Sequence, residues 1–155
     1  MMKIRGMGKL EKRIGKIAKT IDERVKLEIG CSDACFIEER KIHFSILRDY
    51  DQDREYIDNL YATHKDALKL PVYLYSLLHE IGHIHTEAIL DDEDIEVREE
   101  IIRARDSQRY FALPAEQAAT AWAVEYAKNN NATVRVLAHK IERAMEKFLQ
   151  ANITE

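Results

Sequence analysis

The chain has 155 residues, a mass of 18.1 kDa, 46% hydrophobic residues and a formal net charge of −4 at pH 7. This length and composition suffice for one globular domain with a core, and no apolar run approaches the roughly 18 residues of a membrane span. The sequence therefore predicts a single cytoplasmic domain over residues 1–155 with no membrane partner. The acidic balance gives no overall attraction to nucleic acid, so a nucleic-acid partner is not expected.

The charge is unevenly distributed along the chain. Residues 1–26 hold nine Lys or Arg against three acids, and the remainder is acidic. From Lys9 to Ile29 apolar residues recur every three or four positions, and Gly30 follows as a C-terminal cap, so the pattern predicts a long basic amphipathic helix within residues 1–30. We interpret its charges as a solvated face, with docking on a protein or nucleic acid as the alternative. The apolar positions are Leu10, Ile14, Ile17, Ile21, Val25 and Ile29.

The next segments predict a small sheet and a polar connection. Cys31 and Cys35 have no second Cys or His pair at a zinc-knuckle spacing, so reduced thiols are expected. The stretch "ACFIEERKIHFSIL" (34–47) has a charged centre between two apolar runs, which indicates a β-hairpin, although its turn lacks Gly or Asn. The Asp-rich segment 48–59 is expected to be an exposed loop or a frayed helix rather than a core element.

The second half of the chain is predicted to be helical. "LPVYLYSLLHEIGHIHTEAI" (70–89) has a helical apolar stripe, with Pro71 suited to the first turn. The segment 91–100 carries seven acids and one Arg, which predicts a solvated face or loop or, alternatively, a surface that attracts basic substrate segments. Helices are expected over 113–128 and 132–150, the first Ala-rich and the second capped by Asn. The resulting fold class is α+β, mostly helical with a small mixed sheet or hairpin.

The motif "HEIGH" is the strongest chemical signal in the sequence. On a helix a four-residue step turns about 400°, so His79 and His83 project from one face and their imidazoles can bind one ion. Zn²⁺ suits this pair because neutral imidazole is a favoured ligand and one further protein ligand leaves a fourth position open. Glu80 is poorly placed to bind beside the histidines, but it can act as a general base toward a water molecule. Gly82 costs about 1 kcal/mol in mid-helix, which indicates that another element approaches there.

The third ligand is left open among Glu116, Glu125 and His139. Glu116 is favoured because it lies in the first turn of a helix whose small residues would allow close packing against Gly82. Glu125 could instead orient a histidine as an outer carboxylate, and His139 would give an all-histidine site. The small residues are Ala115, Ala118, Ala119 and Ala123.

Three further ring-bearing side chains lie near these motifs in the sequence. His85 lies about 200° from His83 around the helix, so it is not expected to share the metal. Tyr110 and Tyr126 could donate a hydrogen bond to the oxyanion of a tetrahedral intermediate, although packing is the commoner role of such residues.

Two motifs resemble those of the ImmA/IrrE family of small zinc peptidases. These are "HEIGH" (79–83) and "EQAATAWA" (116–123), in the same order and at a similar separation. The resemblance implies a zincin-like fold with an HExxH active-site helix, Zn²⁺ bound by His79, His83 and Glu116, and Glu80 as the general base. It further implies a peptidase of a phage or mobile element whose protein substrate is a helix-turn-helix transcriptional repressor.

The sequence leaves two rival functions. In one, the chain is a non-catalytic, zinc-containing protein that binds a partner or nucleic acid through its basic N-terminal helix. In the other, a different kind of zincin uses His139 as the last ligand. Metal-dependent cleavage of a protein without salt-sensitive DNA binding would favour the peptidase.

Overall fold

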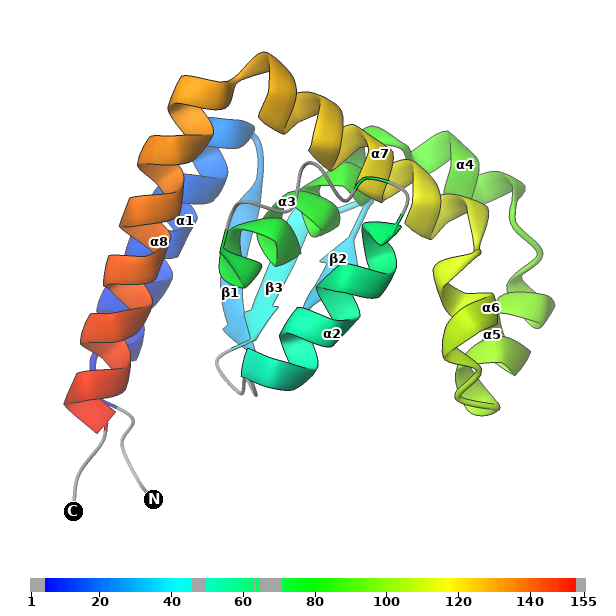
Figure 1. Ribbon diagram of the computed structural model, residues 1–155, viewed down its shortest axis with the longest axis horizontal. Coiled ribbons are helices and arrows are strands. Elements are labelled where there is room, and N and C mark those ends of the chain that lie inside the picture. The colour runs from blue at the N-terminus through cyan, green and yellow to red at the C-terminus, as the bar shows by residue number, and fades with distance from the viewer. Residues whose placement is uncertain (1–4, 46–49, 63, 65–70, 153–155) are drawn as a thin grey trace.

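The computed structural model describes residues 5–45, 50–62, 64 and 71–152 (Figure 1). Within these residues the structure is mostly helical with one small sheet, so the predicted α+β class is confirmed. In chain order the elements are α1 (Met7–Ile21), β1 (Lys26–Gly30), β2 (Ala34–Phe36), β3 (Lys41–Ser45), α2 (Tyr50–Leu60), α3 (Val72–His85), α4 (Glu87–Asp92), α5 (Ile95–Arg103), α6 (Ser107–Phe111), α7 (Pro114–Asn129) and α8 (Asn131–Asn152).

The three strands form a mixed sheet in the order β1-β3-β2. β1 runs parallel to β3, with Lys26 opposite Lys41, and β2 runs antiparallel to β3, with Ala34 opposite His43. The predicted hairpin is therefore confirmed within its described residues, while positions 46 and 47 lie outside them. The turn contains no glycine. Arg40 occupies its left-handed position instead, with φ 51°, a conformation that a non-glycine residue rarely adopts. β2 is left as an edge strand.

The long N-terminal helix predicted up to Ile29 is wrong in its second half. α1 ends at Ile21, and residues 26–30 form the strand β1. The sequence "KLEIG" alternates apolar and polar residues as well as continuing the four-residue apolar spacing, so helix and strand fit its pattern equally. The strand forms because residues 26–30 have a partner in β3. The parallel ladder then satisfies the backbone N–H and C=O groups of this segment.

Asp22 marks the end of α1 and joins three elements. Its carboxylate is buried and accepts hydrogen bonds from the Arg24 backbone N–H at 3.0 Å and the Arg40 guanidinium at 2.6 Å. His85 Nε2, at the end of α3, lies 2.9 Å from the same carboxylate. Burial alone would raise the pKa of Asp22, but the Arg24 N–H, the Arg40 charge and the His85 contact together hold it below its usual value.

We expect Asp22→Asn to destabilise the protein by about 1–3 kcal/mol near pH 7, the range for a hydrogen bond to a charged group. A carboxyl group whose pKa is lowered by folding contributes stability above its unfolded pKa of about 3.9 and loses that contribution as pH falls. The difference in unfolding free energy between wild type and Asp22→Asn should therefore shrink at about pH 3 in urea titrations.

Asp58→Asn, which alters an exposed pair with Arg54, is the control and should cost less than about 0.5 kcal/mol. An Asp22→Asn effect that does not change with pH would contradict this assignment.

α3 is the central helix of the fold. It is buried on nearly all sides, and it packs against α7, α2, α8 and the strands β2 and β3 (Figure 1). The predicted helix over 70–89 is therefore confirmed from Val72, with Pro71 immediately before its first residue. It breaks at Thr86, after which the short α4 begins.

The segment predicted as a loop or frayed helix over 48–59 forms α2 in its described part. The end of this helix enters the core, because Ile57 and Leu60 are each only 1% exposed. The many Asp residues in the first half of the segment led to the prediction of an exposed element, although its last turn is apolar.

The acidic segment 91–100, predicted to be a solvated face or loop, is mostly helical and largely exposed. It covers the end of α4 and the start of α5, where the Asp94 side chain caps the helix by accepting from the backbone N–H groups of Glu96 and Val97. Most of its acids are solvent-exposed, as predicted, but Glu93 is an exception because its side chain is only 6% exposed. α5 and α6 were not expected from the sequence.

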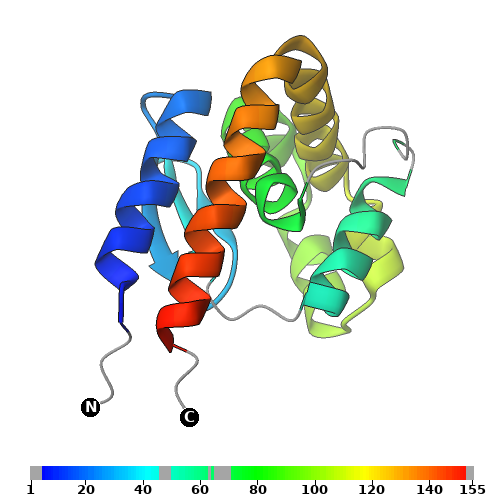
Figure 2. The same cartoon turned by 60° about the vertical axis from the view of Figure 1, so that its left-hand side comes forward.

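α7 and α8 confirm the last two predicted helices. α8 lies beside α1 and runs antiparallel to it, so the two described chain ends are adjacent (Figures 1 and 2). The Asn152 side chain connects them, accepting from the Arg5 backbone N–H at 2.9 Å and donating to the Arg5 carbonyl at 2.7 Å. The predicted buried positions of α8 are confirmed, with Phe148 rather than Leu149 facing the core. They are Val134, Leu137, Ile141, Met145 and Phe148.

Two smaller predictions can be compared with the structure. Both Cys31 and Cys35 are free thiols. Among the described helices, none has the length and apolar character needed to cross a bilayer.

Candidate metal centre

Two histidines of α3 project toward the first turn of α7. His79 and His83 are 2% and 8% exposed, and their rings lie nearly perpendicular with centroids 4.8 Å apart. This is the arrangement that a four-residue step on one helical face predicts. The helix is held in place by the apolar residues around it, so the two imidazoles are fixed by the packing of the core.

α7 carries Glu116 into contact with both histidines. The closest approach of the two helices occurs at Gly82, where an added Cβ would lie 2.5 Å from the Ala119 carbonyl oxygen. Pro114 begins α7, so Glu116 lies in the first turn, and its carboxylate is 1% exposed. The predicted close approach at Gly82 is confirmed, and it explains why Glu116 can reach the histidines.

The donor atoms of the three side chains form a compact group. His79 Nε2 lies 3.6 Å from Glu116 Oε1, and His83 Nε2 lies 2.8 Å from Glu116 Oε2. All three donor atoms fall within 4.8 Å of one another. Donor atoms bound tetrahedrally to one ion at about 2.0–2.2 Å are separated by roughly 3.3 Å. The observed spacing is therefore close to what a shared metal ion requires.

Two buried atoms of this group support a ligand-binding role. Within the described residues, His79 Nε2 has no hydrogen-bond partner, and Glu116 Oε2 has no hydrogen bond of ordinary geometry, although it lies 2.8 Å from His83 Nε2. Buried polar atoms are normally hydrogen-bonded, and one that is not requires an explanation such as a bound ion. Two imidazole nitrogens and one carboxylate oxygen are donors that a divalent transition metal accepts. The residues present thus fit a metal ion.

Thr120 fixes the orientation of His79. Its hydroxyl oxygen lies 3.0 Å from His79 Nδ1, and the contact is fully buried. If Nδ1–H donates to Thr120, the Nε2 lone pair faces the metal position, which is the usual arrangement of a ligating histidine. Sequence reasoning missed Thr120, although it lies one helical turn after Glu116 and therefore shares its face of α7.

The electrostatics of the group keep Glu116 ionised. Burial alone would raise the pKa of Glu116, but the two neighbouring imidazoles hold it well below its usual value. Burial likewise works to lower the pKa of His83, yet the adjacent Glu116 carboxylate raises it overall. A buried anion between two imidazoles is suited to binding a cation.

Glu80 lies beside this group but does not belong to it. Its side chain is half-buried, and its pKa is raised mainly by burial, with Asp33 and Glu116 adding to the effect and the two histidines opposing it. Burial together with Glu80 and Glu116 also raises the pKa of the Cys35 thiol to about 12. The edge strand β2, which contains Cys35, therefore runs close to Glu80 and Glu116.

A second set of side chains contacts Glu116 from α5 and α6. The Tyr110 hydroxyl donates to Glu116 Oε1 at 2.5 Å, and the Arg98 guanidinium lies 3.6 Å from Oε2. Arg98 also pairs with Glu93 at 2.9 Å, and Glu93 accepts the backbone N–H of Ala115 in the first turn of α7. Tyr110 was a candidate from the sequence, whereas Glu93 and Arg98 lay in a segment interpreted as solvated and gave no signal.

The structure does not bring the other candidates into this group. Glu125 is exposed and accepts from Asn129 at 3.2 Å, and His139 is exposed on α8. His85 stacks on Trp122 with ring centroids 4.5 Å apart and contacts Asp22 rather than the metal position. Tyr126 also stacks on Trp122, with ring centroids 5.4 Å apart.

Comparisons of the chain with models of protein families, with curated proteins and with solved structures give no significant match.

Proposed function

We propose that the protein is a zinc-dependent peptidase that hydrolyses a peptide bond in a specific protein substrate. The observation that carries the proposal is the buried group of His79, His83 and Glu116, whose donor atoms lie within 4.8 Å of one another with Glu80 beside them. Zinc is the proposed ion because two imidazoles and one carboxylate, with one tetrahedral position left open, are typical of catalytic zinc sites.

The number of protein donors supports catalysis over a purely structural metal. Structural zinc sites are closed by four protein ligands, whereas catalytic sites have three and keep one position for water or substrate. Within the described residues only three side chains form the group. This argues against the non-catalytic alternative.

Each residue has a distinct role in the proposed reaction. When bound, Zn²⁺ supplies Lewis-acid polarisation of the scissile carbonyl and lowers the pKa of water to about 7. Glu80 takes the proton of the attacking water and later gives it to the leaving amine, so that the peptide C–N bond is replaced by a carboxylate and a free amine. Thr120 holds the His79 ring, and Tyr110 and Arg98 hold the Glu116 carboxylate.

The substrate is proposed to bind as an extended segment along β2. This strand is an edge of the sheet and runs close to Glu80, so a peptide added beside it would pass near the candidate metal centre. The resemblance to ImmA/IrrE peptidases suggests a helix-turn-helix transcriptional repressor of a phage or mobile element as that substrate.

The proposal is tested with Glu80→Gln, which keeps the size of the side chain and removes the base. We expect unchanged zinc content and a loss of about 10²–10⁴-fold in hydrolysis, the usual contribution of a general base. Cleavage is measured by mass spectrometry on a peptide library with zinc-loaded protein, and chelator-treated protein provides the background. Glu125→Gln, an exposed change on α7, is the matched control and should cleave as the wild type does. Undiminished cleavage by Glu80→Gln would exclude the assigned role.

A further inference from the structure

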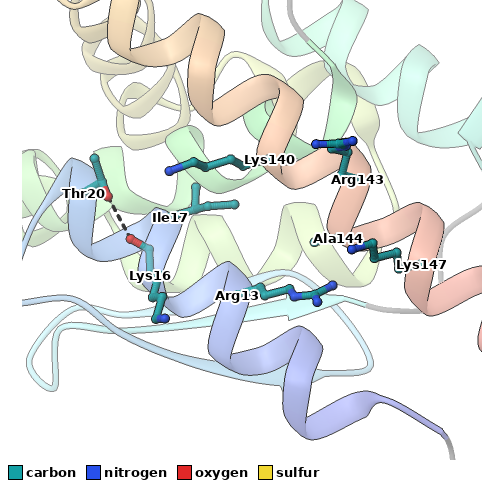
Figure 3. A pocket seen from close by; sticks show the side chains of 8 residues that line it. All are labelled: Arg13, Lys16, Ile17, Thr20, Lys140, Arg143, Ala144 and Lys147. Atoms are coloured by element: carbon teal, nitrogen blue, oxygen red, sulfur yellow. Dashed lines mark hydrogen bonds between the residues drawn. The ribbon is translucent and has the colours of Figure 1, made fainter.

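A basic groove follows the contact between α1 and α8, away from the candidate metal centre. It has a volume of about 350 Å³ and is lined by Arg13, Lys16, Ile17, Thr20, Lys140, Arg143, Ala144 and Lys147 (Figure 3). A neighbouring hollow shares Arg13, Ala144 and Lys147 and extends the groove to Lys9. We call the six cations of the two hollows the basic groove. They are Lys9, Arg13, Lys16, Lys140, Arg143 and Lys147.

The groove joins two parts of the sequence that lie more than a hundred residues apart. α1 supplies one row of cations and α8 the other, and Figure 3 shows Arg13 and Lys140 extending from opposite helices across the groove. Taken alone, the N-terminal cations are the ordinary solvated face of an amphipathic helix, and nothing in their spacing indicates that the α8 cations lie beside them. Because α1 packs antiparallel to α8, the cations of the two helix faces become neighbours and form one cluster of positive charge.

Among the described residues, no acidic side chain lines either hollow, and none of the six cations forms an ion pair with a carboxylate, although α8 also carries the exposed Glu142 and Glu146. The nearest acid of α1, Glu11, is turned away and accepts the Ile29 backbone N–H of β1 at 3.0 Å. In a chain with a net charge of −4, such a cluster is a local feature that focuses positive potential.

We propose that the basic groove binds the phosphodiester backbone of a DNA duplex without reading its sequence. The distance from Lys9 to Lys16, like that from Lys140 to Lys147, covers seven residue steps, about 10 Å of helix. Successive phosphates of one strand advance by about 3.4 Å along the duplex axis, so each row spans about three of them. Arg13 and Arg143 add guanidinium groups, whose planar forks match phosphate oxygens.

The lining of the groove argues against other anionic partners. Among the described residues, Phe148 is the one aromatic residue in the lining, and it is 7% exposed, so the groove offers no ring there on which unpaired bases could stack. None of the large exposed apolar side chains in the described part of the chain lines the groove, which disfavours insertion into a lipid surface. The cations also extend along about 10 Å of each helix, and the hollow is half-open rather than enclosed as pockets for small ligands usually are.

The test uses fluorescence anisotropy of a labelled DNA duplex of about 20 base pairs and arbitrary sequence, between about 50 and 200 mM NaCl. For three to six phosphate contacts we expect a log–log salt slope of about −3 to −5. The variant Arg13→Ala/Arg143→Ala/Lys147→Ala should bind at least roughly tenfold more weakly at low salt, with a slope shallower by about 3.

The matched control removes the same residue types from elsewhere on the surface. Arg103→Ala/Arg135→Ala/Lys128→Ala changes three exposed cations that do not line the groove. It should keep the wild-type slope and bind within about threefold of wild type, because long-range charge effects are screened by salt. An equal loss in both triple variants would overturn the proposal, as would absence of duplex binding by the wild type.

Two further measurements separate this site from its alternatives. Polyglutamate and phosphatidylglycerol vesicles are used as competitors, and stronger binding of either than of the duplex would overturn the DNA assignment. If circular dichroism shows that the triple alanine variant is unfolded, the variant Arg13→Gln/Arg143→Gln is used instead. It keeps side chains of similar length without the charges and should still weaken binding.

The DNA-binding proposal does not depend on the peptidase proposal. Zinc content should be unchanged in all groove variants, and Glu80→Gln should bind the duplex as the wild type does.

Discussion

Replacing Glu116 with alanine should abolish stoichiometric zinc binding, while Glu125→Ala and His139→Ala should each retain one zinc per chain. Glu116 is the only carboxylate that contacts both histidines among the described residues, and its oxygens lie 3.6 Å and 2.8 Å from their Nε2 atoms. Outer-shell partners of metal ligands typically contribute 10–100-fold in affinity, so loss of a direct ligand should cost more than about 100-fold. Zinc content is measured by elemental analysis after dialysis against a weak chelator.

A buried Glu116→Ala change also leaves a cavity, so a conservative variant is needed. Glu116→Gln retains the volume of the side chain and a carbonyl oxygen, but it removes the charge that a metal ligand provides. We expect Glu116→Gln to fold as the wild type does, by circular dichroism, and still to lose most of its zinc. Full zinc occupancy in Glu116→Gln would show that the carboxylate is not a ligand and would remove the main support of the peptidase proposal.

The elements that the sequence predicted well have patterns compatible with only one structure. The apolar stripe of α3, the small-residue face of α7 and the regular spacing in α8 each fit a helix and not a strand. The site follows from the first two, because Gly82 and Ala119 determine where the helices can touch, and that contact places Glu116 beside His79 and His83. These three residues could therefore be proposed together without knowledge of the fold.

The failures lie where local sequence permits two structures or where a contact is purely tertiary. Residues 26–30 fit a helix and a strand equally, and only the partner strand β3 decides. Glu93 and Arg98 look like solvated charges in the sequence, but in the structure Glu93, between α4 and α5, reaches Ala115, and Arg98 of α5 reaches Glu116. Such pairings over long separations leave no periodic signal, so sequence reasoning could not find them.

The basic groove illustrates the same limit on a larger scale. Each of its rows is an ordinary polar helix face, and the sequence alone gave a reason to discount it. Only the adjacency of α1 and α8 makes the cations of the two rows neighbours. Charge clusters formed by two distant helices are thus a class of feature for which the fold is required.

Gly82→Ala should destabilise the protein, although alanine is the better helix former. The new Cβ would lie 2.5 Å from the Ala119 carbonyl oxygen and 3.1 Å from the Ala119 Cα, and backbone atoms of α7 cannot move aside independently. Overpacking in a core costs about 1–3 kcal/mol, and this contact belongs at the upper end of that range. The gain in helix propensity is only about 1 kcal/mol. The net loss in unfolding free energy, measured in urea, should be about 2 kcal/mol.

Gly15→Ala is the matched control, since it makes the same change in the middle of α1 with nothing within 4 Å of the added Cβ. It should stabilise the protein by about 0.5–1 kcal/mol through helix propensity and a more restricted unfolded chain. Because α7 must shift to relieve the contact at Gly82, its Glu116 moves with it, and zinc affinity should fall in Gly82→Ala but not in Gly15→Ala. Equal stabilisation by the two substitutions would show that α3 and α7 are not in close contact, and Glu116 could then not be placed beside the histidines by this packing.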